Sequence, residues 1–224
     1  MSHVLVIARG ELRRIFLSPL AWAVLAVVQL ILGFVFINLL IDYARNAELG
    51  DQFMGVADYM GGGLYGFAII VLLLVMPLMT MRLFAEERKS GSLTLLLSSP
   101  ASLTQIVLGK FLGLTGFILA LLALLAAMPL ALLPGTDLDL GRIAAGLLGL
   151  FLIMLAFGAS GLFMSALTRE PTIAAVASFG LLLMVWLRQI LAYQEGPLAG
   201  LFGYLSLIGH FDNLRRGVFS SADV

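Results

Sequence analysis

The sequence predicts an all-α bundle of membrane-spanning helices, and its composition and the length of its apolar runs carry that prediction. Of its 224 residues, 61% are hydrophobic and only 12% are charged, with a mean hydropathy of +1.08. Soluble domains are about 45–50% apolar and about 25% charged, and a globule this small has too much surface to hide so many apolar side chains. The apolar runs lack the period-two alternation of barrel strands, so helices satisfy the backbone within the membrane.

Charge and cysteine content exclude several other classes of protein. The 13 basic residues balance the 13 acidic ones, which gives no positive field for nucleic acid. Disorder requires low hydrophobicity and high net charge, and this sequence has neither. There is no cysteine, so disulfides and thiolate metal sites are excluded.

Five stretches are long and apolar enough to cross the membrane, since a helix needs about 20 residues to do so. They are residues 19–41, 64–84, 111–133, 143–167 and 172–193. The amides Gln29 and Asn38 lie in the first, where helix packing is favoured over substrate contact. Arg188 lies near the end of the fifth, where snorkelling to the headgroups is favoured over a functional role.

Residues 1–17 are expected to form an interfacial helix that leads into the first span. Apolar residues recur at helical spacing, and charged residues fall largely on the other side; they are Val4, Leu5, Ala8, Leu12, Ile15 and Phe16 against Arg9, Glu11, Arg13 and Arg14. Such a helix lies in the headgroup plane. A basic flank with a purely topological role remains an alternative.

Connector charges predict the orientation. The N-terminal segment and the second-to-third and fourth-to-fifth connectors carry Arg9, Arg13, Arg14, Arg82, Arg88, Lys89, Lys110 and Arg169, against Arg45, Arg142, Arg188, Arg215 and Arg216 on the other side. The positive-inside rule therefore predicts a cytoplasmic N-terminus. Beyond the fifth span, the apolar run 197–209 is too short to cross, so residues 195–217 are expected to form an external re-entrant segment. The whole chain, 1–224, is then one transmembrane domain.

The connector between the second and third spans is the most informative segment. It reads FAEERKSGSLTLLLSSPASLTQIVLGKFLG over residues 84–113. Gly91 permits a positive φ, Pro100 disfavours helix at the preceding residue, and Ser102 can cap the next helix. The pattern predicts two short angled helices at the membrane surface. Because about 25 residues exceeds the usual connection length, a docking surface for a cytoplasmic partner is favoured over a solvated amphipathic linker.

This segment resembles the signature of permease subunits of type-2 ABC exporters, most closely the branch of gliding-motility and nitrous-oxide-reductase-maturation permeases. The matching residues are Glu87, Arg88, Gly91, Leu93, Leu96, Leu97, Pro100, Ser102, Gly109, Lys110 and Phe111, whereas Ser92 and Thr94 replace the usual Thr and Glu. Residues 161–183 and 204–224 resemble the family's fourth-to-fifth hairpin and external re-entrant region. The family's bundle has six spans, so we expect a truncated chain that stops where the sixth would start.

The resemblance implies one permease of an ATP-driven exporter in the bacterial inner membrane. It implies a second permease copy, identical or related, a separate ABC ATPase subunit, and in one branch a periplasmic-domain accessory protein. The coupling segment would be residues 85–110, with ATPase contacts at Glu86, Glu87, Arg88, Lys89, Gly91, Leu93, Leu96, Pro100 and Ser102. The phosphate-loop pattern fails around Gly109 and Lys110, so ATP and Mg²⁺ are expected on the partner and no cofactor on this chain.

Three other functions stay open at the level of sequence. An ATP-independent carrier or channel is disfavoured because no Asp or Glu lies inside the five spans. A membrane anchor for a partner complex would need the same docking connector. An intramembrane serine protease is a remote alternative, in which Ser160 would be the nucleophile and His210 the base, but no pattern places the two together. The transported substrate is not indicated.

Overall fold

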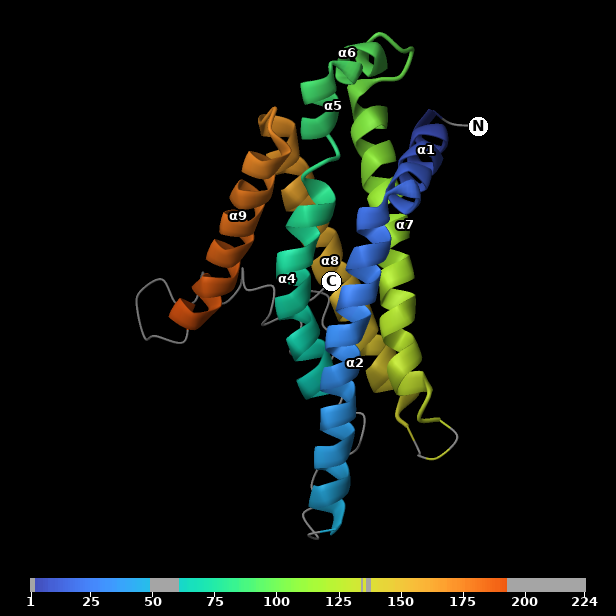
Figure 1. Ribbon diagram of the computed structural model, residues 1–224, viewed down its shortest axis with the longest axis vertical. Helices are drawn as coiled ribbons and strands as arrows, with labels where there is room; N and C mark the ends of the chain where they lie inside the picture. The colour runs from blue at the N-terminus through green and yellow to red at the C-terminus, as the bar shows by residue number, and fades with distance from the viewer. Residues whose placement is uncertain (1–2, 49–60, 134, 136–137, 193–224) are drawn as a thin grey trace. The chain divides into compact units, whose positions relative to one another are not determined.

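The computed structural model describes residues 3–48, 61–133, 135 and 138–192 (Figure 1). Those residues form helices and turns without any strand, which confirms the all-α prediction for this part of the chain. The elements are α1 (His3–Leu17), α2 (Pro19–Glu48), the π-helix η1 (Gly61–Tyr65), α4 (Gly66–Thr80), α5 (Ala85–Ser90), α6 (Ser92–Leu97), α7 (Leu103–Leu130), α8 (Leu140–Leu167) and α9 (Pro171–Ala192).

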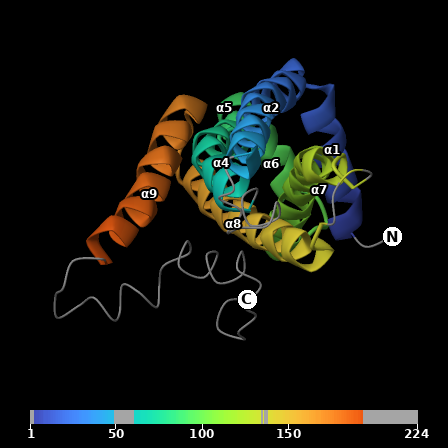
Figure 2. The same ribbon diagram turned by 90° about the horizontal axis from the view of Figure 1, so that it is seen from below.

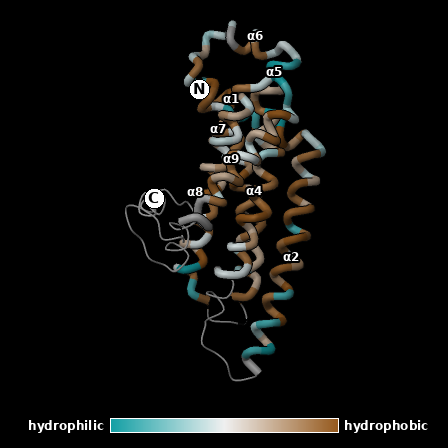
Figure 3. The backbone as a smooth tube through the Cα atoms, turned by 90° about the vertical axis from the view of Figure 1, so that its left-hand side faces the viewer, coloured by the Kyte–Doolittle hydropathy of each residue, from teal (hydrophilic) through white to brown (hydrophobic). Residues whose placement is uncertain are grey.

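Four of the five predicted spans are confirmed as helical stretches long and apolar enough to cross a membrane. They are Pro19–Asn46, Gly62–Ser90, Leu103–Leu130 and Leu140–Leu167. The predicted fifth span corresponds to α9, whose 22 residues extend about 33 Å at 1.5 Å per residue. That α9 crosses the membrane stays a prediction. The predicted re-entrant segment 195–217 lies outside the described residues. Figure 3 shows apolar residues along these helices and hydrophilic ones gathered at α5 and in the last turns of α2.

The chain divides into two compact units. One unit comprises Met1–Val24, Leu72–Ala120 and Met154–Val185, and the other comprises Leu25–Val71, Leu121–Ile153 and Trp186–Val224. The first, which we call the elbow unit, contains α1, α5 and α6 together with the adjoining parts of α2, α4, α7, α8 and α9.

Within the elbow unit, α1 packs along α7 through a row of glycines (Figures 1 and 2). A Cβ atom on Gly109 would lie 2.7 Å from the Cβ of Ile7, and one on Gly113 would lie 2.7 Å from the Cβ of Glu11. Real Cβ atoms do not approach this closely, so glycine is needed at both positions for α1 to reach α7. Gly116 provides the next contact, against Leu12.

The predicted assignment of α1 residues to a polar and an apolar face was partly wrong. Glu11, predicted on the polar face, is only 6% exposed, whereas Leu5, predicted on the apolar face, is 55% exposed. The reason is the glycine row, because α1 turns toward α7 the side that fits these glycines rather than its most apolar side.

In the same unit α8 approaches α4 closely at Gly161. A Cβ atom on Gly161 would collide with the side chain of Thr80, and one on Gly158 would lie 2.9 Å from Leu114. Small residues allow backbones this close to pack in membranes. Thr80 is fully buried and donates its hydroxyl to the carbonyl of Met76 at 2.9 Å.

In the second unit, the buried ring of Tyr65 packs directly against Gly146 of α8. A Cβ atom added to Gly146 would lie only 2.5 Å from Cε2 of this ring. Asn38 donates to the carbonyl of Phe34 in its own helix at 2.7 Å, so its amide is satisfied locally rather than across helices. The side chain of Arg188 lies outside the described residues.

We expect Gly161→Val to lower the free energy of unfolding by about 1–3 kcal/mol, because overpacking displaces Thr80 or the backbone of α4. Thermal or denaturant unfolding of the detergent-purified chain measures this effect. Gly180→Val in α9 is the matched control, since no atom lies within 4 Å of its added Cβ. Equal shifts for the two variants would contradict the close approach of α8 to α4.

Candidate functional site

The segment from α5 to α6 is sharply bent at Gly91. Gly91 adopts φ +75°, the left-handed conformation that its position in the sequence predicted, and it separates α5 from α6. The hydroxyl oxygens of Ser90 and Ser92 lie 2.9 Å apart across the bend, so one donates to the other, and the remaining hydroxyl hydrogen can be donated to the carbonyl of Glu87, which lies within reach of both. The two hydroxyls therefore hold the bend in place.

A capping box closes the segment where α7 begins. The backbone N–H of Gln105 donates to the hydroxyl of Ser102 at 3.3 Å, and the N–H of Ser102 donates to Oε1 of Gln105 at 3.1 Å. This reciprocal pattern satisfies two free donors of a helix start. It confirms Ser102 as the N-cap, and α6 ends before Pro100 as expected.

A buried lysine ties α5 to α1 and α7. Lys110 of α7 is 1% exposed, and its Nζ lies 3.1 Å from Oε2 of Glu11 and 2.7 Å from Oε1 of Glu87. The two carboxylates are themselves 6% and 14% exposed. The ammonium also lies 5.1 Å from the centre of the Phe84 ring, within the range of a cation–π contact.

Arg14 of α1 completes this charge cluster, which we define as Glu11, Arg14, Glu87 and Lys110. Its guanidinium lies 3.1 Å from Glu11 Oε1 and 2.9 Å from Glu87 Oε1, and it donates to the backbone carbonyl of Arg82 at 3.2 Å. The two cations balance the two anions. Arg14 is 43% exposed, whereas Lys110 and Glu11 are buried, and charges buried this deeply are retained only when they are paired. The ion pairs therefore tie three helices together.

Ser165 of α8 holds α5 from another side. Its hydroxyl accepts hydrogen bonds from the backbone N–H groups of Phe84 and Ala85 at 3.0 and 3.1 Å, and donates to the carbonyl of Met81 at 2.9 Å. α5 has no side-chain cap at its own N-cap residue, so a residue from a distant helix supplies it. Lys89 also pairs with Glu170, at 2.7 Å, on the surface.

The structure divides the predicted site residues into an exposed set and a half-buried set. Glu86, Arg88, Lys89, Gly91, Pro100 and Ser102 are exposed, whereas Glu87, Leu93 and Leu96 are half-buried. Glu87 belongs to the charge cluster and so faces inward. Leu95, which was not among the candidates, is 75% exposed at the bend; on a helix, i and i+3 share a face, and Leu95 lies off the face of Leu93 and Leu96.

Sequence reasoning also missed Glu11, Arg14 and Ser165 as functional candidates. The sequence offered one signal for the cluster, namely Glu11 and Arg14 three residues apart in α1. The same spacing is equally typical of an ion pair on a helix surface. Ser160, the nucleophile of the protease alternative, donates its hydroxyl to the carbonyls of Ala156 and Phe157 in its own helix. His210 lies outside the described residues.

We expect Lys110→Met to destabilise the chain by about 3–5 kcal/mol, because it leaves Glu11 and Glu87 buried without their cation. Lys89→Met, which breaks only an exposed pair, should cost no more than about 1 kcal/mol. Denaturant unfolding in detergent compares the two.

A rescue variant separates the charge effect from lost packing. Adding Glu11→Met and Glu87→Met to Lys110→Met removes both buried anions and should recover most of the stability. If the triple variant is as unstable as the single one, the cluster does not act through its charges.

Comparison with known families places the chain among membrane transport proteins. A family model described as "ABC-2 family transporter protein" matches residues 38–211, well over half of the chain, and this match includes α5, α6, Glu87 and Lys110. No curated protein matches the sequence. Together with its apolar helices, the match shows that this chain belongs to the ABC-2 transporter family, as a multi-pass membrane permease of that class.

Proposed function

We propose that this chain is the permease subunit of an ATP-driven exporter and that a separate ATPase subunit acts on the segment 85–110. Membership of the ABC-2 family supports the class of function. The charge bias of the connectors supports a cytoplasmic position for the N-terminus and for this segment. The resemblance of residues 84–113 supports the gliding-motility and nitrous-oxide-reductase-maturation branch, an inner-membrane location and a second permease copy.

The two faces of the segment suit two different tasks. The outer side presents Arg88, Leu95 and Pro100, which are all exposed, and arginine is enriched in protein-binding hot spots. The inner face presents Glu87 to Lys110 and Arg14. Docking on the outer face would therefore leave the charge cluster intact.

The charge cluster is the observation that carries the proposal. A push on α5 reaches α1 and α7 through Glu87 and reaches α8 through Ser165. Pulling a buried carboxylate from its cation costs several kcal/mol, so the connected helices follow α5 rather than release it. ATP and Mg²⁺ would bind to the partner, and this chain would contribute the translocation path.

We expect Leu95→Ser to weaken binding of the ATPase subunit about tenfold, which corresponds to roughly 1.4 kcal/mol, because it removes an apolar side chain that is 75% exposed at the bend. The measurement uses the ATPase recovered with the tagged chain from its native membrane, rebound to each purified variant. Leu140→Ser at the start of α8 is the control, since that leucine is also exposed, at 53%. Recovery of the intact chain without any ATPase would refute the proposal.

We expect Ser165→Ala to leave ATPase binding intact while lowering permease-dependent ATP hydrolysis severalfold. The variant removes the hydroxyl that fixes the start of α5, so movement of the bend passes less completely to α8. Ser160→Ala is matched to it, because that hydroxyl donates to carbonyls of its own helix. Equal hydrolysis rates for both variants at saturating ATPase would eliminate the proposed path through α8.

A further inference from the structure

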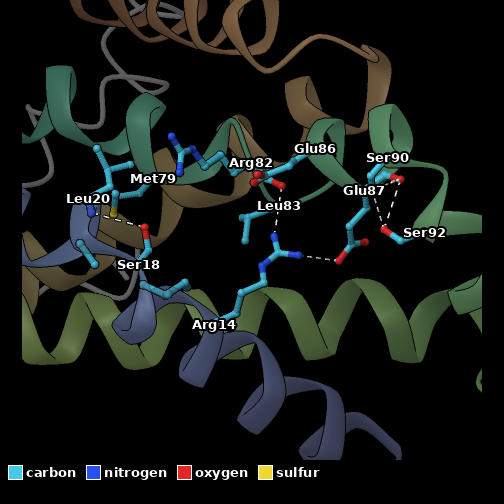
Figure 4. A pocket seen from close by; sticks show the side chains of 12 residues that line it. Arg14, Ser18, Leu20, Met79, Arg82, Leu83, Glu86, Glu87, Ser90 and Ser92 are labelled. Carbon is cyan, nitrogen blue, oxygen red and sulfur yellow. Dashed lines mark hydrogen bonds and ion pairs between the residues drawn. The ribbon is translucent and has the colours of Figure 1, made fainter.

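A half-open pocket of about 390 Å³ lies in the elbow unit beside the charge cluster (Figure 4). It is bordered by the junction of α1 with α2 and by the chain from the end of α4 to the bend at Gly91. Its lining is apolar at one end and polar at the other, and includes Leu20, Met79, Arg82, Glu86, Ser90 and Ser92. A volume of this size is typical of a site for a small ligand or headgroup.

The pocket lies at the level where two spans leave the apolar layer. The first candidate span begins at Pro19, and the charged stretch that ends the second begins at Arg82. Trp22, exposed at the start of α2, donates its ring N–H to the carbonyl of Phe16 at 2.8 Å. Tryptophan is enriched at the membrane–water interface, so the pocket opens where lipid headgroups lie.

Two opposite charges in the pocket have no partner within the part of the chain that the structure describes. Arg14 and Glu87, which also line the pocket, form an ion pair with each other. Among the described residues, neither the guanidinium of Arg82 nor the carboxylate of Glu86 makes a hydrogen bond or an ion pair; Arg82 contributes only its backbone carbonyl to Arg14. A ligand that satisfies both must carry a negative and a positive group.

The order of these groups matches the order of groups in a phospholipid. Along the chain the pocket presents the apolar Met79, then the cation of Arg82, then the anion of Glu86, then the hydroxyl of Ser90. In Figure 4 the guanidinium of Arg82 points toward the end that carries Leu20, Met79 and Ser18, and Ser90 and Ser92 lie at the opposite end. A zwitterionic phospholipid runs from acyl chains through phosphate to ammonium in the same direction.

We propose that this pocket binds the headgroup of phosphatidylethanolamine. Arg82 binds the phosphate, since guanidinium groups bind phosphate oxygens in bidentate fashion, and Glu86 accepts from the ammonium with help from the serine hydroxyls. The acyl end lies against Leu20 and Met79. Phosphatidylcholine carries no N–H to donate to Glu86, and phosphatidylglycerol carries no cation, so neither satisfies both ends of the pocket.

The test is lipid retention by the full chain, and it needs no ATPase, so its result is independent of the proposed function. The chain is placed in nanodiscs with equal amounts of phosphatidylethanolamine, phosphatidylcholine and phosphatidylglycerol, and retained lipids are counted by native mass spectrometry. We expect preferential retention of phosphatidylethanolamine. Arg82→Ala, which keeps the backbone carbonyl, should lower this retention about tenfold, the effect of losing one charged hydrogen-bond partner.

Glu86→Gln tests recognition of the ammonium. It is an exposed position, so folding is not at risk, and retention of phosphatidylethanolamine should fall to the level of phosphatidylcholine. Arg13→Ala, an exposed arginine of α1 that does not line the pocket, is the control and should retain lipid as the unchanged chain does. Unchanged retention in Arg82→Ala or Glu86→Gln would overturn the proposal.

A soluble headgroup separates the membrane lipid from a free phosphate ester. Glycerophosphoethanolamine at millimolar concentration should not displace the retained lipid, because it lacks the acyl chains that contact Leu20 and Met79. Displacement would mean that the pocket takes a soluble ligand, which contradicts the assignment to lipid.

Discussion

The burial of Lys110 is the constraint on which the elbow unit depends. An ammonium that is 1% exposed needs carboxylates beside it, and these come from α1 and α5, neither of which is adjacent to Lys110 in sequence. Glu11 can reach it only because Gly109 and Gly113 let the backbone of α1 approach α7. The glycine row and the charge cluster therefore require each other. Wider packing would leave the lysine unpaired, and loss of the lysine would leave two carboxylates buried.

The features predicted correctly from sequence are those set by local chemistry. Gly91 gives the positive φ and Ser102 caps α7, each for a reason contained within a few residues. The faces of α1 were not predictable in the same way. Hydropathy orients a helix against lipid or water, whereas α1 is oriented by a glycine surface on another helix. The ion pairs of Glu87 were likewise not predictable, because its partners Arg14 and Lys110 lie on other helices.

The helix α5 is stabilised almost entirely by its contacts with neighbouring helices. A helix of six residues is far too short to persist alone, and its N-terminal amides are capped by Ser165 rather than by its own sequence. Its inward contacts are buried charges, but its outward pair with Glu170 is exposed and therefore weak. Force applied to α5 is thus transmitted more strongly toward α1 and α7 than along the surface to the start of α9.

Three consecutive residues explain how one short helix can serve several purposes. Successive side chains on an α-helix are separated by about 100°, so Glu86, Glu87 and Arg88 face three directions. Glu86 lines the pocket, Glu87 binds Lys110 and Arg14 and also borders the pocket, and Arg88 is exposed. Arg14 borders the pocket and belongs to the charge cluster, so occupancy of the pocket and the position of α5 are physically linked. The charged run is therefore better understood as three differently directed contacts than as a single solvated surface.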